Sequence, residues 1–206
     1  MNFFFDLDGT LWDSQDRLYS LFCDLVPENS LSRDEYWRLK RMKVSNEEIL
    51  KTLFHYNRDK ITAFTSTWLS LIESSRYLKK DHLFPFTRDV LSFLRSRGHN
   101  VFFVTLRQSE EMAEKEIVEK DIARFCVSCL VSNGASTKDQ VVRDASISIS
   151  RDDFFIGDTG VDVMAGKALG MHTIAVLSGF RERTILEGYA PDYIFNDISD
   201  IKLMLA

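Results

Sequence analysis

Short apolar runs recur along the chain, and most of them end in acidic or turn-forming residues. Such runs are typical of strands that are buried on both faces of a sheet. They predict strands at Asn2–Asp6, Val101–Thr105, Phe154–Asp158, Thr173–Leu177 and Tyr193–Phe195, with a further one within Cys126–Val131.

Amphipathic stretches separate several of these strands and predict helices. They cover Thr87–Arg97, closed by Gly98, then the Glu- and Lys-rich Ser109–Lys120, and Val161–Leu169, closed by Gly170. Strands that alternate with helices favour an α/β fold with a doubly wound, mostly parallel, Rossmann-like sheet.

Residues 14–82 have a different pattern, without a strand-like run. Apolar residues recur there at helical spacing, as in Ile61, Phe64, Trp68, Leu71 and Ile72. We therefore expect a small all-helical domain at 14–82, inserted into an α/β core made of 1–13 and 83–206. Aromatic residues of this segment are expected to fill its core.

Composition excludes several classes of function. The chain has 206 residues, of which 45% are hydrophobic, and 26 basic against 31 acidic side chains give a net charge of −5. This balance argues against a nucleic-acid-binding surface. No secretory signal or membrane-spanning stretch is apparent, so we expect a cytoplasmic protein. Its three cysteines include Cys126 and Cys129, which lack partners for a zinc site and are interpreted as core thiols.

The first predicted strand runs into two carboxylates, Asp6 and Asp8, followed by Gly9 and Thr10. Ligands of open α/β sheets bind at this edge. Two neighbouring carboxylates there are costly unless a cation joins them, and a divalent metal is the simplest one. An acidic surface turn is the alternative for this pair taken alone.

A second acidic pair follows the strand at Phe154–Asp158, in the pattern G-D-x-x-x-D. Gly157 permits close backbone approach, and Asp158 and Asp162 lie at the strand end and on the first helical turn. Asp158 can add an anionic oxygen to the ligands of a small hard cation such as Mg²⁺. Asp162 could instead simply favour the helix N-terminus.

Two further candidates are Thr105, which ends an apolar strand, and Lys138, which follows the loop at 133–135 and opens a helix-like stretch. A strand-terminal Thr often bonds only nearby backbone. Lys115, Lys120 and Arg143 are the alternatives to Lys138 as the basic residue of the site, but Lys138 alone follows a loop that comes after a predicted strand.

These four pieces, in this order, resemble the haloacid dehalogenase-like hydrolase superfamily, in particular the phosphoglycolate phosphatase-like branch with a helical cap inserted after the first motif. The resemblance implies that Asp6 is the nucleophile and a metal ligand. It implies that Asp8 is the general acid/base and places its backbone carbonyl on the metal. A second carboxyl that can hold a proton suits both halves of phosphoester hydrolysis.

The resemblance also assigns the remaining residues. It implies that Thr105 and Lys138 bind the phosphate, that Asp158 is a ligand of Mg²⁺, and that Asp162 either orients Lys138 or a metal-bound water or ligates the metal directly. Relatives often have Asn or Ser after the Thr, whereas this chain has Leu106 and then Arg107. Arg107 is counted with the candidate substrate-binding residues.

The implied function is a Mg²⁺-dependent phosphatase that hydrolyses a small phosphorylated metabolite through an aspartyl-phosphate, with the helical insert closing over the site as a cap. A phosphomutase of the same superfamily shares every core residue and remains an alternative. A metabolite-binding protein without turnover is a third reading, although none of the core positions is altered. A monomer and a homodimer are both compatible with the sequence.

Overall fold

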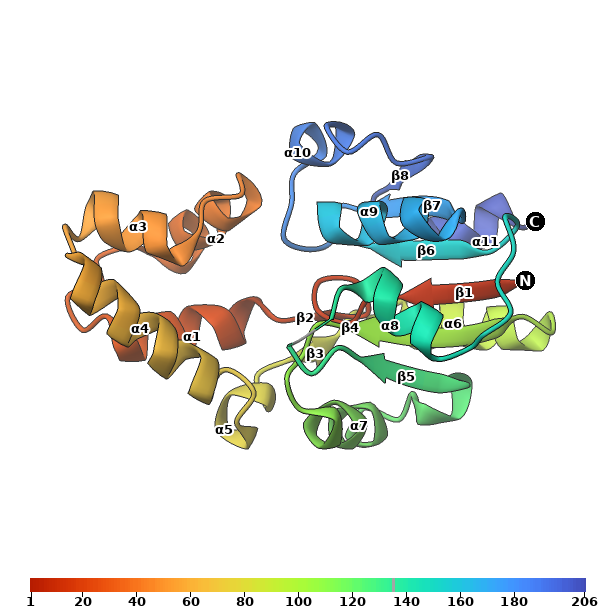
Figure 1. Cartoon of the computed structure of the whole chain (residues 1–206), viewed down its shortest axis with the longest axis horizontal. Coiled ribbons are helices and arrows are strands. Elements are labelled where there is room, and N and C mark those ends of the chain that lie inside the picture. Colours follow the sequence, from red (N-terminus) through yellow and green to blue (C-terminus); the bar gives the residue numbers. More distant parts are fainter. Residues whose placement is uncertain (135) are drawn as a thin grey trace. The chain divides into compact units, whose positions relative to one another are not determined.

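The apolar runs form a parallel sheet. The computed structural model describes residues 1–134 and 136–206, so the expected loop at 133–135 includes one residue, Ala135, outside the described part. Six strands of the described residues pair in the order β5-β4-β1-β6-β7-β8, all in parallel (Figure 1). Their bounds are β1 Asn2–Phe5, β4 Asn100–Thr105, β5 Ser128–Val131, β6 Phe154–Gly157, β7 His172–Val176 and β8 Tyr193–Phe195. The predicted parallel α/β sheet is confirmed.

Strand β1 lies at the centre of the sheet, and its three phenylalanines are fully buried. Successive side chains of a strand point to opposite faces. Phe3 accordingly stacks on Phe154 with ring centroids 5.0 Å apart, while Phe4 stacks on Phe102 at 4.8 Å on the other face. An apolar residue at every position therefore suits a strand that is covered on both sides.

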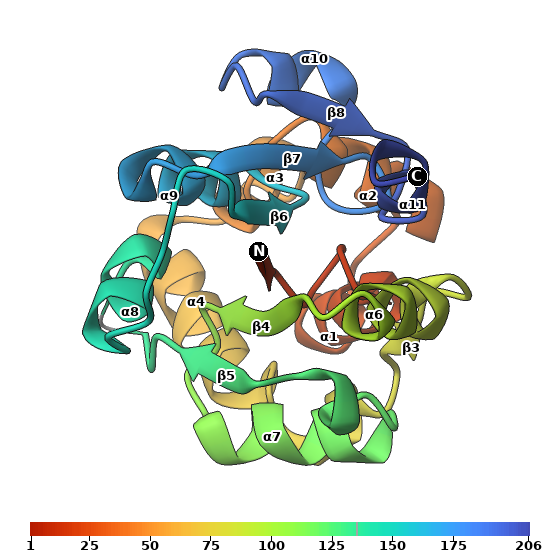
Figure 2. The same cartoon turned by 90° about the vertical axis from the view of Figure 1, so that its right-hand side faces the viewer.

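Helices cover both faces of the sheet (Figure 2). On one face, α6 (Thr87–Ser96), α7 (Glu110–Glu119) and α11 (Asp200–Met204) contribute to the core that contains Phe3 and Phe5. On the other face, α8 (Lys138–Asp144) and α9 (Gly160–Leu169) pack on the core that contains Phe4. The doubly wound arrangement is thus present. A 3₁₀ helix, η1 (Ala123–Phe125), and helix α10 (Arg183–Glu187) complete this part of the chain.

By its internal contacts the chain divides into two compact units, 1–13 with 83–206 and 14–82. The second unit is built from helices α1 Gln15–Leu25, α2 Arg33–Arg41, α3 Asn46–Leu53, α4 Arg58–Leu71 and α5 Ser75–Leu78. Phe22, Tyr36 and Phe64 lie in its buried core, as expected for aromatics at helical spacing. Two short strands, β2 (Trp12–Asp13) and β3 (His82–Leu83), pair where the chain passes between the units.

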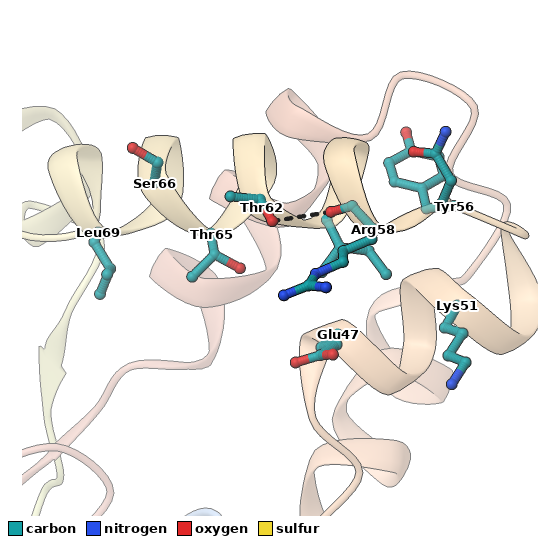
Figure 3. A pocket seen from close by; sticks show the side chains of 10 residues that line it. Glu47, Lys51, Tyr56, Arg58, Thr62, Thr65, Ser66 and Leu69 are labelled. Carbon is teal, nitrogen blue, oxygen red and sulfur yellow. Dashed lines mark hydrogen bonds between the residues drawn. The ribbon is translucent and has the colours of Figure 1, made fainter.

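The helical unit carries a surface groove between α3 and α4, with a volume of about 820 Å³ (Figure 3). Its walls carry both charges and several hydroxyls. The lining residues are Glu47, Lys51, Tyr56, Asn57, Arg58, Ile61, Thr62, Thr65, Ser66 and Leu69. Most of these side chains are exposed, so the groove is open to solvent.

The cysteines are free thiols. Burial raises the pKa of Cys126 to about 11 and that of Cys129 to about 12. Both side chains are partly buried and pack against the core that contains Phe3 and Phe5, which fits the interpretation of core thiols. Over the residues that the structure describes, no helix is both long enough and apolar enough to cross a bilayer.

Candidate active site

The candidate residues gather at the carboxyl ends of three adjacent strands. Asp6 follows β1, Thr105 ends β4 and Asp158 follows β6, and β1 pairs directly with both other strands. Parallel strands bring their carboxyl ends to one edge, where ligands of open α/β sheets bind. The topology therefore places on one edge side chains that are far apart in the sequence.

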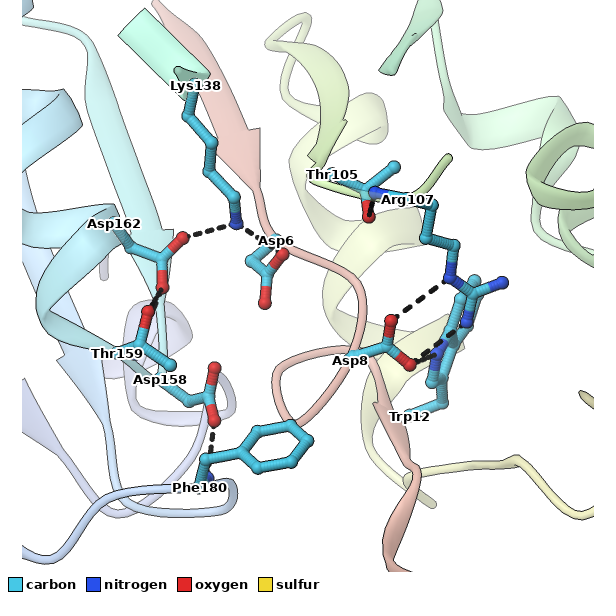
Figure 4. A network of polar contacts seen from close by, with 10 residues as sticks. All are labelled: Asp6, Asp8, Trp12, Thr105, Arg107, Lys138, Asp158, Thr159, Asp162 and Phe180. Carbon is cyan, nitrogen blue, oxygen red and sulfur yellow. Dashed lines mark hydrogen bonds and ion pairs between the residues drawn. The ribbon is translucent and has the colours of Figure 1, made fainter. Parts of the chain in front are cut away.

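Three carboxylates form a buried cluster at this edge. One oxygen each of Asp6, Asp158 and Asp162 lie within 4.8 Å of one another, and their residues are only 7%, 0% and 1% exposed. Lys138, at the start of α8, reaches into the cluster (Figure 4). Its Nζ donates hydrogen bonds to Oδ1 of Asp6 and, at 2.5 Å, to Oδ1 of Asp162. The structure thus brings four of the sequence-predicted residues together.

The carboxylate oxygens of this cluster differ in how they are satisfied. Both oxygens of Asp162 accept hydrogen bonds, Oδ1 from Lys138 and Oδ2 from the backbone N–H and the hydroxyl of Thr159, at 3.0 and 2.6 Å. Oδ2 of Asp158 accepts from the backbone N–H of Phe180, but Oδ1 of Asp158 is buried and has no hydrogen-bond partner among the described residues. A buried carboxylate oxygen is expensive to leave unsatisfied. Its position suits a cation.

Close backbone approach makes room for these side chains. Gly9, in the turn after β1, adopts φ +87°, and a Cβ there would collide with the Asp158 carboxylate. A Cβ at Gly157 would overlap the Asp162 carboxyl group, as expected from the sequence. Side chains at these positions would displace the cluster.

Burial and mutual repulsion raise the pKa values of the cluster. Desolvation is the main cause of the rise in the Asp6 pKa to about 7, which Lys138 opposes and Asp162 reinforces. The pKa of Asp158 is also raised well above its usual range, first by burial and then by the neighbouring Asp6 and Asp162. The pKa of Lys138 is raised, because attraction by Asp162 and Asp6 outweighs burial. One ammonium among three carboxylates leaves an excess of negative charge for a divalent cation to balance.

These shifts predict how the stability of the metal-free protein depends on pH. Because the Asp6 pKa in the folded state, about 7, exceeds its ordinary 3.8, the folded protein holds a proton that the unfolded chain releases between these values. Stability should therefore fall as pH rises through this interval and level off above it. Chemical denaturation in EDTA across this range measures the effect, and the Asp6→Asn variant should show a shallower fall. An equal slope in both proteins would contradict the assignment to Asp6.

Asp8 lies in a separate set of contacts at the same edge. Its Oδ1 accepts from Trp12 Nε1 and from Nη2 of Arg107, and its Oδ2 accepts from Nε of Arg107, each at 3.0 Å. Arg107 also donates through Nη1 to Glu116. The structure therefore places Arg107 against two carboxylates. Its expected part in substrate binding stays a prediction.

Thr105 is 2% exposed, and its hydroxyl oxygen accepts a 3.3 Å hydrogen bond from the backbone N–H of Arg107. Such local bonding is common for a strand-terminal Thr. This bond leaves the hydroxyl hydrogen available as a donor, as a phosphate contact requires.

Besides Thr159, which binds Asp162, three contributors to the site were not anticipated from the sequence. The indole of Trp12 donates a hydrogen bond to Asp8, and the carboxylate of Glu116 accepts one from Arg107. The backbone N–H of Phe180 donates to Asp158. Of these three, only Glu116 could have been found from the sequence pattern. It lies three residues after Ala113 and one before Ile117 in α7, on the buried face of the helix, and is itself 3% exposed.

The donor set fits a hard divalent cation. Such ions prefer anionic and carbonyl oxygens, and the cluster offers converging carboxylate oxygens that no Cys or His of the described residues joins. Oδ1 of Asp158 is the buried oxygen of the cluster that nothing in residues 1–134 and 136–206 hydrogen-bonds, while both oxygens of Asp162 are already bound. The residues therefore fit a metal held mainly by Asp6 and Asp158.

The sequence profile of the haloacid dehalogenase-like hydrolase family matches residues 3–176 of the chain. This range contains the sheet from β1 to β7, the acidic cluster and Lys138. The chain therefore belongs to the haloacid dehalogenase-like hydrolase family. The family resemblance and the enzyme class inferred from the sequence are confirmed.

The chain is also similar to individual proteins over nearly their full length. Pyrophosphatase PpaX of Bacillus cereus is 25% identical over 215 residues, which cover 98% of this chain and 94% of that protein. Among solved structures, a haloacid dehalogenase-like hydrolase from Streptococcus pneumoniae superposes with a TM-score of 0.80 at 23% identity, covering 100% of this chain and 98% of the other. A predicted phosphoglycolate phosphatase from Haemophilus somnus gives 0.76 at 16% identity, covering 99% and 97%. These two structures support the fold.

Proposed function

We propose that this hydrolase is a Mg²⁺-dependent phosphatase that releases phosphate from a small phosphorylated metabolite through an aspartyl-phosphate on Asp6. The observation that carries the proposal is the buried carboxylate cluster, which Lys138 binds and which keeps one Asp158 oxygen that no described residue hydrogen-bonds. A structural ion-pair cluster has no need of a third carboxylate with an unsatisfied oxygen. A site that binds a cation and an anion together needs this third carboxylate and its unsatisfied oxygen.

Asp6 is the proposed nucleophile. Its Oδ1 is held by Lys138, while its Oδ2 makes no hydrogen bond within the described residues and is therefore able to attack phosphorus. Attack by a carboxylate divides the hydrolysis into two easier displacements. The Lys138 ammonium offsets negative charge on Asp6 and on the transferring phosphoryl group, and Asp162 fixes the direction of that ammonium.

Asp8 is the proposed proton carrier. The leaving oxygen must gain a proton when Asp6 is phosphorylated, and the attacking water must lose one when the aspartyl-phosphate is hydrolysed. Asp8 lies two residues after the nucleophile, and its side chain is 20% exposed, so it can exchange protons with solvent between turnovers. The buried hydroxyl of Thr105 is the proposed donor to a phosphate oxygen.

Asp6, Asp158 and the backbone carbonyl of Asp8 would hold the Mg²⁺. When bound, the ion offsets the repulsion between the Asp6 carboxylate and a phosphate dianion. Asp162 is assigned to orienting Lys138 and not to the metal, because both of its oxygens are already bound by donors.

The names of the relatives suggest substrates to test first. Pyrophosphatase PpaX and the predicted phosphoglycolate phosphatase suggest that inorganic pyrophosphate and phosphoglycolate belong in the panel. We further propose that the helical unit acts as a cap that selects among small phosphorylated metabolites, and that the protein works in the cytoplasm.

The test is phosphate release from a panel of small phosphoesters and pyrophosphate, with Mg²⁺ and after its removal by EDTA. We expect hydrolysis of at least one substrate with Mg²⁺, and a loss on the order of a hundredfold or more without it. Restoring Mg²⁺ should restore the rate. Turnover that persists at full rate in EDTA would contradict the proposed metal site, and an isomerised sugar phosphate in place of free phosphate would indicate a mutase.

A further inference from the structure

Arg107 binds both oxygens of the Asp8 carboxylate. Its Nε donates to Oδ2 and its Nη2 to Oδ1, each at 3.0 Å, and Trp12 Nε1 adds a third hydrogen bond to Oδ1 at 3.0 Å. Two parallel bonds from a planar guanidinium fix the plane of a carboxylate as well as its position. In Figure 4 the Asp8 carboxylate is turned toward Arg107 and Trp12.

Arg107 is itself held rigidly. Its side chain is 3% exposed, and its Nη1 donates to Glu116, which in turn pairs with Lys120 at 3.0 Å. The guanidinium carbon lies 5.1 Å from the centre of the Trp12 ring, within the range of a cation–π contact. These contacts restrain the Arg107 side chain from several sides. It therefore cannot move to follow a substrate without breaking a buried charge network.

The sheet explains why these two residues meet. Strands β1 and β4 are parallel neighbours, with Phe5 opposite Phe103. Asp8 lies three residues beyond Phe5 and Arg107 four beyond Phe103, so both leave the sheet at the same edge. The contact between Asp8 and Arg107 therefore forms because this chain has an arginine two positions after Thr105.

We propose that Arg107 is a positioning residue that holds the Asp8 carboxyl group in the orientation for proton transfer, and that it does not bind the substrate phosphate. The inference rests on the proposed function, in which Asp8 protonates the leaving oxygen. Most of the donors of Arg107 are bound to Asp8 and Glu116. A phosphate-binding Arg would instead direct its paired donors toward the site of the anion.

Leaving groups of different basicity separate these roles. An alkyl phosphate such as glycerol 2-phosphate needs a proton on its leaving oxygen, whereas p-nitrophenyl phosphate expels a stable anion. For Arg107→Met we expect kcat/KM to fall by about tenfold to a hundredfold with the alkyl phosphate and by no more than about threefold with p-nitrophenyl phosphate. Arg107→Lys should show the same selectivity with a smaller loss. Competitive inhibition by inorganic phosphate should be unchanged.

Asp8→Asn provides the comparison. It should show the same dependence on the leaving group, and adding Arg107→Met to it should cost little more, since the two residues act as one unit. Arg124→Met removes an exposed Arg that pairs with Asp121 and should leave both substrates unaffected. If Arg107→Met unfolds because Glu116 loses one of the cations that pair with it, the double variant Arg107→Met/Glu116→Gln removes the excess buried charge and is tested in its place.

Two results would overturn the inference. One is an equal loss with both substrates accompanied by weaker inhibition by phosphate, as a substrate-binding Arg predicts. The other is wild-type kinetics for folded Arg107→Met while Asp8→Asn shows the expected selectivity. Failure of the proposed function looks different, because Asp8→Asn would then lack any dependence on the leaving group.

Discussion

Asp6→Asn is expected to reduce phosphate release by a factor on the order of a thousandfold or more, since an amide cannot replace a carboxylate as the nucleophile. The substitution preserves the shape of the side chain. Lys138 keeps its partner Asp162, so the variant should stay folded. The measurement is initial-rate phosphate release with the best substrate of the panel, together with rapid acid quenching and mass spectrometry to detect phosphate on Asp6 in the wild-type protein.

Asp152→Asn is a matched control for loss of a carboxylate. Asp152 is exposed and lies just before β6 in the same unit, outside the carboxylate cluster, and its replacement should leave the rate unchanged. Asp6→Asn should also weaken Mg²⁺ binding, which calorimetry can follow without turnover. Retention of substantial activity by folded Asp6→Asn would rule out the aspartyl-phosphate mechanism.

The sheet could be predicted from the sequence because its strands are buried on both faces. Asn2–Phe5 and Phe154–Gly157 contain apolar residues at nearly every position, and each is followed by acidic residues that end the strand. The same applies to the helices that Gly98 and Gly170 close, both of which have positive φ. Strand ends were predicted within one residue or two. Such small shifts arise because the last residue of an apolar run can still belong to the turn.

The acidic cluster could be predicted because parallel strands bring sequence motifs to one edge. The contacts of Asp8 could not be predicted, because the side chains that make them are brought together only by the packing of the folded chain. Arg107 follows Thr105 as an ordinary loop residue, and Glu116 belongs to a helix rich in Glu and Lys that resembles a solvated surface. Both are buried because each satisfies the charge of the other. Pairing of this kind leaves no signal in the sequence beyond the position of Glu116 on the buried face of α7.

Lys138→Met is expected to abolish most of the activity and to destabilise the protein at neutral pH. Without the ammonium, Asp6 and Asp162 lose the cation that both of them contact, within a cluster that already includes buried Asp158. Removing one partner of a buried ion pair costs about 3–5 kcal/mol. The loss of a group that stabilises the transferring phosphoryl charge lowers kcat by about a hundredfold to a thousandfold. Urea unfolding in EDTA and phosphate release with saturating Mg²⁺ measure the two effects separately.

Arg143→Met is the matched control, because Arg143 lies on the same helix as Lys138 but is half-exposed. In the described part of the chain its polar contacts are a 4.0 Å ion pair with Asp139 and a hydrogen bond to a backbone carbonyl. It should change stability by less than about 1 kcal/mol and leave activity intact. Lowering the pH should recover part of the stability of Lys138→Met, because protonation removes the repulsion between the carboxylates. The double variant Lys138→Met/Asp162→Asn should likewise regain stability without regaining activity. If it regained both, Lys138 would serve only to neutralise Asp162, and the cation that assists phosphoryl transfer would have to be another residue.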